Sequence, residues 1–342
     1  MKLLVTGASG FVGSALLPRL FRALPDASIS LLLLPGERIP DDWSSRISRV
    51  DRGDIVDREI VDRAIAGSDR VVHLAACVSY CRQDRARLTE VNAGGVQHVV
   101  DACIAYGVER LVHISSIGAL GCSRDGTAVN EQTPFNWPGG FYYMKSKYQG
   151  QQIVEQAVEQ QGLRAVILNP ASIMGPGDPY PESSFNRLMS AVYRAPVFPT
   201  FTGGQAVVDV RDVADIVIKA LLDETTRGSY ILAGHNLRYG VILRALLRHA
   251  GRKPPVLPVP SPLLSLAGLG MEGLSGLTGR RPLLTFAYGR LSGWESYCCS
   301  DRSRREFEHT YIDFERTSED SCRYFEQTFL HRKPADVQPA TD

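Results

Sequence analysis

Tyr143 and Lys147 stand four residues apart within the segment 141–147. On an α-helix this spacing places the phenol and the ammonium on the same face, one turn apart. A phenol has a pKa of about 10, and a cation held close to it lowers that value. The pair therefore predicts a tuned acid/base of the kind that carbonyl chemistry needs. Because Tyr-x-x-x-Lys occurs in many helices, the prediction requires support from a second motif.

Three glycines near the N-terminus, Gly7, Gly10 and Gly13, provide that second motif. They follow the apolar run 3–5 at the spacing G-x-x-G-x-x-G, and residues 14–21 then have a helical pattern. In a strand–glycine–helix unit the first glycine permits the tight turn, the second lets backbone N–H groups approach a diphosphate, and the third lets the helix pack close to the strand. The N-terminus of the helix attracts the anion. The segment predicts a dinucleotide-binding turn, and the alternative is a βα turn without a ligand.

The elements that position these motifs alternate along the first half of the chain. The expected strands are 28–34, 47–50, 70–74, 109–115 and 164–168, and the expected helices are 57–66, 86–106 and 141–161. Such alternation is typical of a parallel sheet with helices on both faces. Ligands bind beyond the carboxyl ends of the strands in these folds, where both motifs fall. The sequence therefore predicts an α/β fold with a Rossmann-type doubly wound parallel sheet in residues 1–170.

The second half of the chain differs in its sequence pattern, because prolines cluster between residues 170 and 199. We expect 206–224, which contains a helical run, to pack back on the first domain. Residues 171–205 and 225–332 are expected to form a smaller C-terminal substrate-binding lobe. The leucine- and glycine-rich segment within it, 263–277, has two interpretations: an apolar flap over the substrate or ordinary core packing. The polar, proline-containing end, 333–342, is predicted to be disordered.

Composition limits the classes of protein. The chain has 342 residues, of which 44% are hydrophobic and 22% charged, as in ordinary globular proteins. The formal net charge of +1 gives no indication of a nucleic-acid partner. No uninterrupted apolar stretch approaches the roughly 18 residues of a membrane span, and the first strand begins at residue 2, which leaves no room for a signal peptide. We expect a cytoplasmic protein.

The cysteines indicate neither disulfides nor a metal. Seven cysteines form no regular framework, and an odd count in a chain of this length is typical of reduced thiols. Cys77 and Cys81 are four residues apart, but no further His or Cys pair accompanies them at zinc spacing. We therefore predict no metal site.

Taken together, the motifs resemble the extended short-chain dehydrogenase/reductase family, which includes nucleotide-sugar epimerases, dihydroflavonol reductases and 3β-hydroxysteroid dehydrogenases. The resemblance extends over residues 1 to about 330. It is carried by the segments Thr6–Gly13, Gly53–Ile55, His73–Ala76, Val91-Asn92, His113–Ser116, Tyr143–Lys147, Asn169–Ser172 and Val210–Ala214. The pattern is most similar to that of the dihydroflavonol-reductase and hydroxysteroid-dehydrogenase branch.

The resemblance implies a third catalytic residue and a set of cofactor contacts. In the family a Ser or Thr five residues before a glycine bonds the substrate oxygen; Gly121 selects Ser116, and Ser115 is then structural. With Tyr143 and Lys147 it forms a Ser-Tyr-Lys site, in which the lysine also bonds the nicotinamide ribose. The implied cofactor-binding residues are Gly7, Ser9, Gly10, Phe11, Val12, Gly13, Asp54, Ile55, Ala75, Ala76, Val78, Asn92, Tyr143, Lys147, Pro170, Ala171 and Ile173. Among them Asp54 and Ile55 contact the adenine.

The choice between NADP(H) and NAD(H) depends on the end of the second strand. No acid directly follows Leu34; Glu37 lies three residues on, and Arg38 is next to it. A carboxylate here would bond the ribose 2′-OH of NAD, whereas a guanidinium would meet the 2′-phosphate of NADP. Family members that use NADP often carry the arginine where Leu34 stands. We expect Arg38 to favour NADP(H) over NAD(H).

The expected reaction is hydride transfer between the nicotinamide and a ketone, an aldehyde or the corresponding alcohol. Ser116 is followed by Ile117-Gly118, which lack the acidic pair of the sugar-nucleotide dehydratases, and the segment 203–209 lacks the arginine of the sugar epimerases. Leu263, Leu264, Leu266, Leu269 and Phe286 suit a hydrophobic or small carbonyl substrate. The alternatives are a nucleotide-sugar or sugar epimerase with tightly bound NAD, and a non-catalytic dinucleotide sensor or scaffold.

Two further features stay open at this point. Phe135 and Trp137 either line the substrate pocket or pack the loop that carries them. The family often dimerises through the helices expected at 86–106 and 141–161, so the resemblance raises a homodimer as an expectation.

Overall fold

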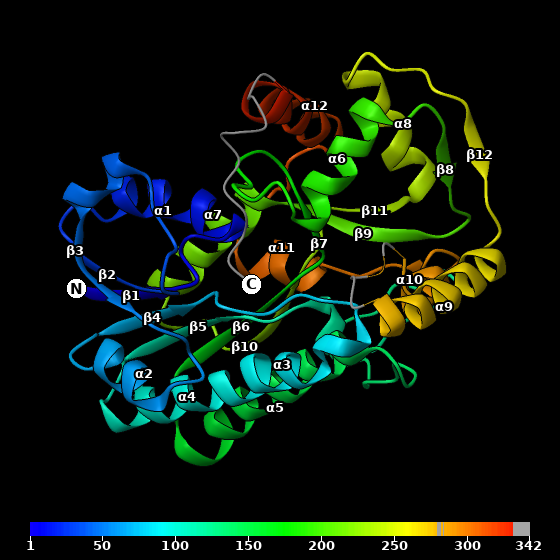
Figure 1. Ribbon diagram of the computed structural model, residues 1–342. Helices are drawn as coiled ribbons and strands as arrows, with labels where there is room; N and C mark the ends of the chain where they lie inside the picture. Colours follow the sequence, from blue (N-terminus) through cyan, green and yellow to red (C-terminus); the bar gives the residue numbers. More distant parts are fainter. Residues whose placement is uncertain (279–281, 283, 331–342) are drawn as a thin grey trace.

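A seven-stranded parallel sheet forms the centre of the first domain in the computed structural model, which describes residues 1–278, 282 and 284–330 (Figure 1). The strands run in the order β10-β6-β5-β4-β1-β2-β3. Their bounds are β1 (Lys2–Thr6), β2 (Ser28–Leu33), β3 (Ile47–Arg52), β4 (Arg70–His73), β5 (Arg110–Ile114), β6 (Ala165–Pro170) and β10 (Gly228–Leu232). The direction of winding reverses between β1 and β4, which is where ligands bind in such sheets.

Helices cover both faces of this sheet, as Figure 1 shows. The helices are α1 (Phe11–Ala23) and α7 (Val210–Leu222) on one face, and α2 (Arg58–Ile65), α3 (Arg85–Thr89), α4 (Val96–Ala105) and α5 (Tyr142–Gln161) on the other. Alternate residues of β1 supply the two cores: Leu3 and Val5 pack towards α1 and α7, and Leu4 packs towards α2 and α4. The predicted doubly wound α/β fold is confirmed.

The prediction of a single continuous helix over 86–106 is wrong, because the α-helix is interrupted in its middle. A π-helical turn, Glu90–Gly95, separates α3 from α4. The buried Asn92 of this turn bonds outside its own helix, and the main chain of Asn92 lies so close to α5 that a Cβ on Gly150 would be 2.1 Å from its carbonyl oxygen. The extra residue of a π turn re-aims a side chain in this way, and such turns are common at functional sites.

The domain boundary after residue 225 also needs correction. The sequence predicts that residues 225–332 belong to the lobe, but β10 pairs with β6 as the seventh strand of the main sheet. Its residues Tyr230, Ile231 and Leu232 are fully buried, which explains why this short apolar run joins the core. Helix α11 (Asp301–Glu306) packs on the same strand, because the Ser303 hydroxyl donates to the Ile231 carbonyl at 2.7 Å.

The lobe is built on a second, smaller sheet. This sheet contains β7 (Ser172–Met174), β9 (Gly204–Asp209), β11 (His235–Arg238) and β13 (Glu295–Ser296), and a separate pair is formed by β8 (Phe198–Thr200) and β12 (Val256–Pro258). Its helices are α6 (Ser184–Arg194), α8 (Tyr239–His249), α9 (Ser261–Thr278), α10 (Phe286–Leu291) and α12 (Phe314–Phe325). Short 3-10 turns occur at Asp41–Arg46, Arg82–Asp84 and Ile117–Ala119, and a π turn at Glu326–Leu330.

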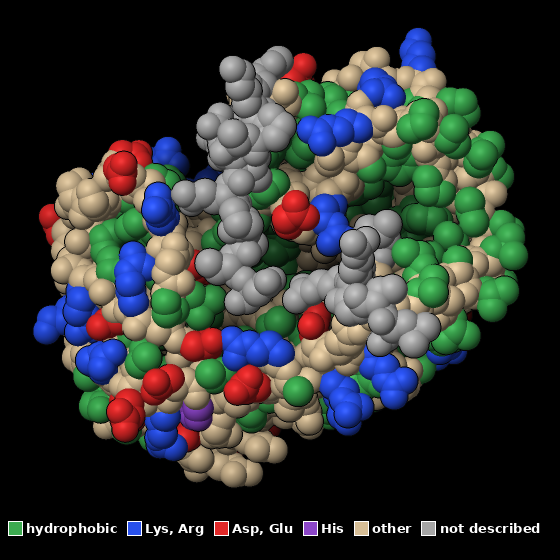
Figure 2. Space-filling view, in the orientation of Figure 1, with side chains coloured by type: hydrophobic (Ala, Val, Ile, Leu, Met, Phe, Trp, Pro, Cys, Tyr) green, Lys and Arg blue, Asp and Glu red, His purple; other side chains and the backbone are tan. Residues whose placement is uncertain are grey.

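The leucine-rich segment is a helix, α9, and it is not core. The side chains of Leu263, Leu266, Leu269 and Leu274 are between 55% and 66% exposed. Figure 2 shows hydrophobic side chains gathered at the edge of the molecule where α9 and β12 lie. The interpretation as ordinary core packing is therefore wrong. Among the described residues, no helix combines the length and apolar character that a membrane crossing requires. The end of the chain predicted to be disordered, 333–342, lies outside the described residues.

Candidate active site

The glycine turn after β1 is shaped for close approach. Gly7 has a φ of +67°, and a Cβ there would lie 2.6 Å from the backbone nitrogen of Ala75, at the end of the neighbouring β4. A Cβ on Gly13 would lie 2.1 Å from the Ala8 carbonyl oxygen, so α1 packs directly against the turn. Gly10 is less crowded, since its nearest contact would be 3.3 Å. The crowding at Gly7 and Gly13 agrees with a tight turn and a closely packed helix, and the approach of Gly10 to a diphosphate stays a prediction.

The N-terminus of α1 has features that favour an anion. Its N-cap residue, Gly10, supplies no side-chain hydrogen bond, and the first turn contains no acidic residue. The first N–H groups of a helix have no partner within the helix, and together with the positive end of the helix dipole they favour a phosphate. These observations fit the diphosphate of a dinucleotide, with Ser9, Phe11 and Val12 in the same turn.

The lobe reaches over this turn. The ring of Phe11 stacks on Phe185 of α6, with centroids 6.3 Å apart and planes at 9°. The Tyr180 hydroxyl bonds Ser9, and burial raises the pKa of Tyr180. No sequence pattern pointed to Tyr180 or Phe185, because both are brought to the turn only by the packing of the lobe.

The residues assigned to the adenine end lie beyond β3. The Asp54 carboxylate accepts from Arg87 of α3 and from the Val56 amide at 3.2 Å, and Ile55 is buried against Gly95. Arg87 thus ties the loop after β3 to α3. These contacts position the loop, and the contact with adenine stays a prediction.

Glu37 and Arg38 lie beyond β2, in different environments. One carboxylate oxygen of Glu37 accepts from the Leu34 amide at 2.9 Å. Arg38 is exposed, and within the described part of the chain its guanidinium forms no hydrogen bond or ion pair. The arginine is therefore available to a ligand, whereas the glutamate is partly engaged.

Asn92 joins three elements beneath the expected ribose. Its Oδ1 accepts from the Cys77 amide at 2.8 Å, and its Nδ2 donates to the Cys77 carbonyl at 2.8 Å and to the Ser146 hydroxyl at 3.0 Å. The amide thereby fastens the loop after β4 to α5. In that loop Ala75 faces Gly7, whereas Ala76 and Val78 are exposed. The structure gives Asn92 a positioning role, and its direct contact with cofactor stays a prediction.

The two serines after β5 have different partners. Ser115 is buried, and its hydroxyl donates to Gln151 at 2.9 Å. The Ser116 hydroxyl is half-buried and bonds the Tyr143 phenol, while it also accepts from the Gly118 amide at 3.0 Å. This geometry agrees with the choice of Ser116 as the residue beside the reacting oxygen.

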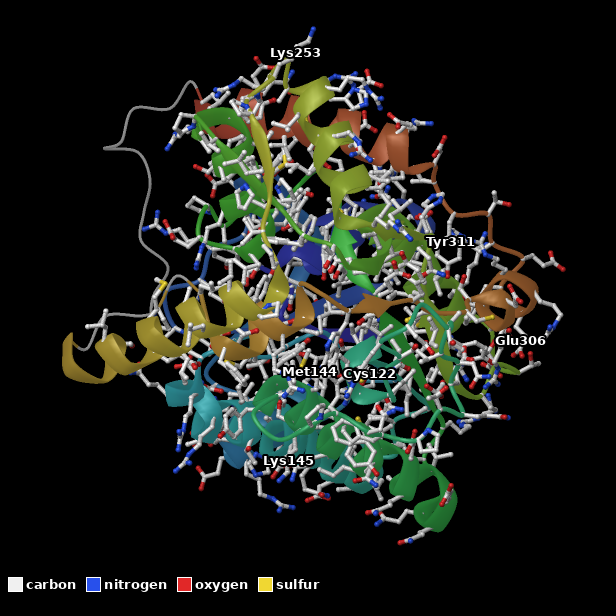
Figure 3. The ribbon with its side chains drawn as sticks, turned by 90° about the vertical axis from the view of Figure 1, so that its right-hand side faces the viewer. Cys122, Met144, Lys145, Lys253, Glu306 and Tyr311 are labelled. Carbon is white, nitrogen blue, oxygen red and sulfur yellow. The ribbon has the colours of Figure 1, made fainter. Side chains whose placement is uncertain are left out.

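Helix α5 brings Tyr143 and Lys147 to the same side, together with Gln151 one turn further on. The buried Lys147 ammonium donates to the Ile114 carbonyl at 2.9 Å, at the end of β5. Asn169 completes the frame, because its Nδ2 donates to the Ser116 carbonyl at 2.9 Å and to Gln151 at 2.7 Å. Figure 3 shows the sidedness of α5: the labelled Met144 lies inward and Lys145 lies on the outer side.

The expected acidification of Tyr143 by Lys147 does not agree with the electrostatics. Burial raises the pKa of Tyr143, the Ser116 hydrogen bond lowers it, and Lys147 is absent from the effects on this group. The ammonium is occupied by the Ile114 carbonyl, and burial lowers the pKa of Lys147 to about 8. The phenol therefore holds its proton at neutral pH, and the Lys147 ammonium lies one helical turn away.

Two histidines under the site are buried, as Lys147 is. The rings of His73 and His113 stack 5.4 Å apart, and the Thr6 hydroxyl bonds His73 Nδ1 at 2.7 Å. Burial, aided by the charge of Lys147, lowers the pKa of His73 to about 3 and shifts His113 in the same direction. Both imidazoles are neutral and add no charge beside the lysine.

The low pKa of Lys147 predicts a pH dependence of stability. The native lysine releases its proton near pH 8 and the unfolded one near pH 10.5, so the unfolded chain binds more protons between these values. The free energy of unfolding should consequently rise over this interval, by on the order of 3 kcal/mol, relative to Lys147→Met. Urea unfolding at several pH values measures it. For the exposed control Lys145→Met, the plot of unfolding free energy against pH should run parallel to that of the unmodified protein. If the plot for Lys147→Met also ran parallel to it, the assignment of the lowered pKa to Lys147 would be contradicted.

The residues predicted to border the nicotinamide lie at the end of β6 and just beyond it. Pro170 is the last residue of that strand and is buried, and the Ala171 amide donates to the Leu232 carbonyl at 2.9 Å. Ile173 lies in β7, half-buried. The structure therefore brings Pro170, Ala171 and Ile173 beside the strand end that carries Ser116, as sheet order requires.

Phe135 and Trp137 are accounted for by packing. The Trp137 indole donates to the Leu120 carbonyl at 2.8 Å and lies 5.2 Å from the Phe141 ring and 5.9 Å from the Trp294 ring. Phe135 stacks on Tyr148 at 4.3 Å, on the outer part of α5. Of the two interpretations, these contacts favour loop packing. Within the described ranges no group of three or more His, Cys, Asp or Glu side chains is arranged to hold a metal.

The chain is similar in sequence to known proteins. Residues 3–233 match the profile of the family described as "NAD dependent epimerase/dehydratase family". The chain is 30% identical over 317 residues to sterol demethylase protein B of Methylococcus capsulatus, covering 90% of this chain and 92% of that protein. It is also 30% identical over 336 residues to a putative dihydroflavonol 4-reductase of Synechocystis, covering 94% of each.

A solved structure agrees over nearly the whole chain. The crystal structure of gox2253 superposes with a TM-score of 0.80 at 26% identity and covers 97% of this chain and 99% of that one. The matched profile spans the glycine turn, Ser116, the Tyr143–Lys147 pair and β10. Because the profile covers more than half of the chain, the protein belongs to the NAD dependent epimerase/dehydratase family.

Proposed function

We propose that the protein is an NAD(P)-dependent oxidoreductase that interconverts a ketone or aldehyde and the corresponding alcohol. The observation that carries the proposal is the bond between the Tyr143 phenol and the Ser116 hydroxyl at the end of β5, with the buried Lys147 one helical turn away. The name of one similar protein, a putative dihydroflavonol 4-reductase, supports a reduction.

Each catalytic side chain has a distinct task in this proposal. When bound, the dinucleotide supplies or accepts the hydride. Ser116 and Tyr143 hold the substrate oxygen from two sides, and Tyr143 transfers the proton to or from it. Lys147 bonds the nicotinamide ribose and provides the positive charge behind the phenol. Gly7, Gly10, Gly13 and Ser9 hold the diphosphate at the N-terminus of α1.

The protonated Tyr143 phenol suits the role of the acid in carbonyl reduction. Burial raises the pKa of Tyr143, so the phenol stays protonated at neutral pH and is ready to donate. A protonated phenol is an acid, as the reductive direction requires.

Cofactor turnover with a panel of aldehydes and ketones tests the proposal. A reductase consumes the reduced dinucleotide in proportion to the product formed. A sugar epimerase would recycle its cofactor without net consumption, and a dinucleotide sensor would bind without any reaction. The absence of net hydride transfer to every carbonyl offered, in either direction, would overturn the proposal.

We also propose that NADP(H) is the cofactor and that Arg38 binds its 2′-phosphate. The support is the unbonded, exposed Arg38 guanidinium beside the partly engaged Glu37. Arg38→Ala should weaken NADPH binding by roughly 10–100-fold, since a hydrogen bond to a charged group is worth about 1.5–3 kcal/mol, and should leave NADH binding unchanged. Calorimetric titration with both dinucleotides measures this.

The nearby Arg52 provides the matched control. Its side chain donates to the Glu37 carbonyl at 2.8 Å and is therefore already occupied. Arg52→Lys should keep the preference for NADPH. Equal affinity of the unmodified protein for NADH and NADPH, or a preference that survives Arg38→Ala, would contradict the role of Arg38. The homodimer through α4 and α5 and the cytoplasmic location stay predictions.

A further inference from the structure

Three tyrosine rings from distant parts of the chain form a continuous row that ends at the catalytic phenol. The Tyr143 ring lies 5.9 Å from that of Tyr80 in the loop after β4, and the Tyr80 ring meets Tyr288 of α10 edge-on at 5.3 Å. Tyr288 is 47% exposed, whereas Tyr80 and Tyr143 are half-buried. The row therefore leads from the surface of the lobe to the reacting hydroxyl.

Helix α9 contacts both segments that carry Tyr80 and Tyr288. A Cβ on Gly268 of α9 would lie 2.5 Å from the Thr285 carbonyl, and a Cβ on Gly289 of α10 would lie 2.5 Å from the Ser265 amide nitrogen. The two helices thus touch backbone to backbone. The same helix α9 meets the loop that carries Tyr80, through a 3.1 Å bond from Gln83 to Ser275.

The row is neutral and aromatic. Burial raises the pKa of Tyr80 and of Tyr288, so neither phenol carries charge at neutral pH. Arg187 of α6 lies near Tyr288, at the outer end of the row. A flat ring finds aromatic partners along this row, since aromatic rings attract one another.

On the basis of the proposed function, we propose that Tyr80 and Tyr288 form a specificity-determining wall that selects substrates whose reacting carbonyl belongs to a flat ring system. Aromatic side chains attract a ring at centroid separations of about 4.5–7 Å, beyond the burial of apolar area, and an open chain gains less from the same surface. The wall thus favours cyclic ketones and their alcohols over open-chain carbonyls.

The experiment compares 1-tetralone with 2-hexanone, a ring ketone and an open-chain ketone. The unmodified protein should have a higher kcat/KM for 1-tetralone than for 2-hexanone. Tyr80→Ala and Tyr288→Ala should each reduce the ratio of these two kcat/KM values by roughly tenfold, because each removes both the aromatic interaction with the ring and the apolar area that the ring buries. Tyr80→Phe and Tyr288→Phe, which keep the rings, should keep the ratio. Tyr106→Ala is the matched control, because Tyr106 is also 47% exposed but lies at the end of α4.

A binding measurement separates this inference from the proposed function. Saturation-transfer NMR of 1-tetralol on the Tyr143→Phe background should show weaker binding when Tyr288→Ala is added, with the melting temperature unchanged. If no carbonyl is reduced, the proposed function fails, while this measurement still decides the role of the wall. A ratio that does not change in the alanine variants, or unaltered 1-tetralol binding, would overturn the inference.

Discussion

Tyr143→Phe should lower kcat for carbonyl reduction by roughly 10²–10⁴-fold, the usual contribution of a positioned general acid. The substitution removes one oxygen, the atom that bonds the Ser116 hydroxyl and that we assign to the proton transfer. The ring remains, so its contact with Tyr80 and the packing of α5 are preserved. Steady-state kinetics with the best carbonyl of the panel measures the loss, and titration should show unchanged dinucleotide affinity.

The same helix provides a matched control for this variant. The Tyr148 hydroxyl accepts from Gln152 at 2.8 Å within α5 and lies outside the catalytic frame. Tyr148→Phe therefore removes an identical atom from the same helix and should retain full turnover. Retention of most activity by Tyr143→Phe would reject Tyr143 as the acid, whatever the outcome for the control.

Gly13→Ala should both destabilise the protein and abolish tight dinucleotide binding. The added Cβ would lie 2.1 Å from the Ala8 carbonyl oxygen, which is backbone and has no side-chain freedom to yield. Overpacking of this kind costs about 1–3 kcal/mol, and the clash forces α1 away from the turn. A displacement on the order of 1 Å can cost about 100-fold in a positioned interaction, so the affinity for the dinucleotide should fall to a comparable extent.

Gly94→Ala is the control for the added methyl group. No atom lies within 4 Å of a Cβ built on Gly94, although this glycine lies in the π turn close to the site. Its unfolding free energy should stay close to that of the unmodified protein or rise slightly, because alanine restricts the unfolded chain. Thermal unfolding of both variants, with and without dinucleotide, decides the comparison. Equal stability of Gly13→Ala and Gly94→Ala would contradict the close packing of α1.

The two predictions concern different parts of one site. Gly13 determines where the N–H groups of α1 lie, and Tyr143 is assigned to the transfer of a proton to or from the substrate oxygen. The phenol is held by Ser116 and by α5, whereas the glycine turn joins β1 to α1. The effects of the two substitutions on dinucleotide affinity should therefore separate clearly: large for Gly13→Ala and absent for Tyr143→Phe.

The sequence predicted the elements that depend on neighbours in the chain. The strand–glycine–helix unit at 3–21, the helix that carries Tyr143 and Lys147, and its end at Gly162 were all recognisable, and Gly162 has the left-handed conformation typical of a helix end. The family resemblance, through the spacing to Gly121, also selected Ser116 over Ser115, and the structure gives the two hydroxyls correspondingly different partners. The glycine unit, the helix and its end arise from periodicity and turn chemistry within about twenty residues.

The tertiary structure decided everything that depends on residues far apart. Only the packed fold shows that Lys147 donates its hydrogen bond to the Ile114 carbonyl, that β10 completes the sheet, and that Asn92 sits in a π turn clamped against α5. Tyr80 and Tyr288 lie far apart in the sequence and carry no motif, yet they line up beside Tyr143. The physical reason is that burial and contact, which set the pKa of Tyr143 and the shape of its surroundings, are properties of the whole packed chain and leave no periodic trace in any one segment.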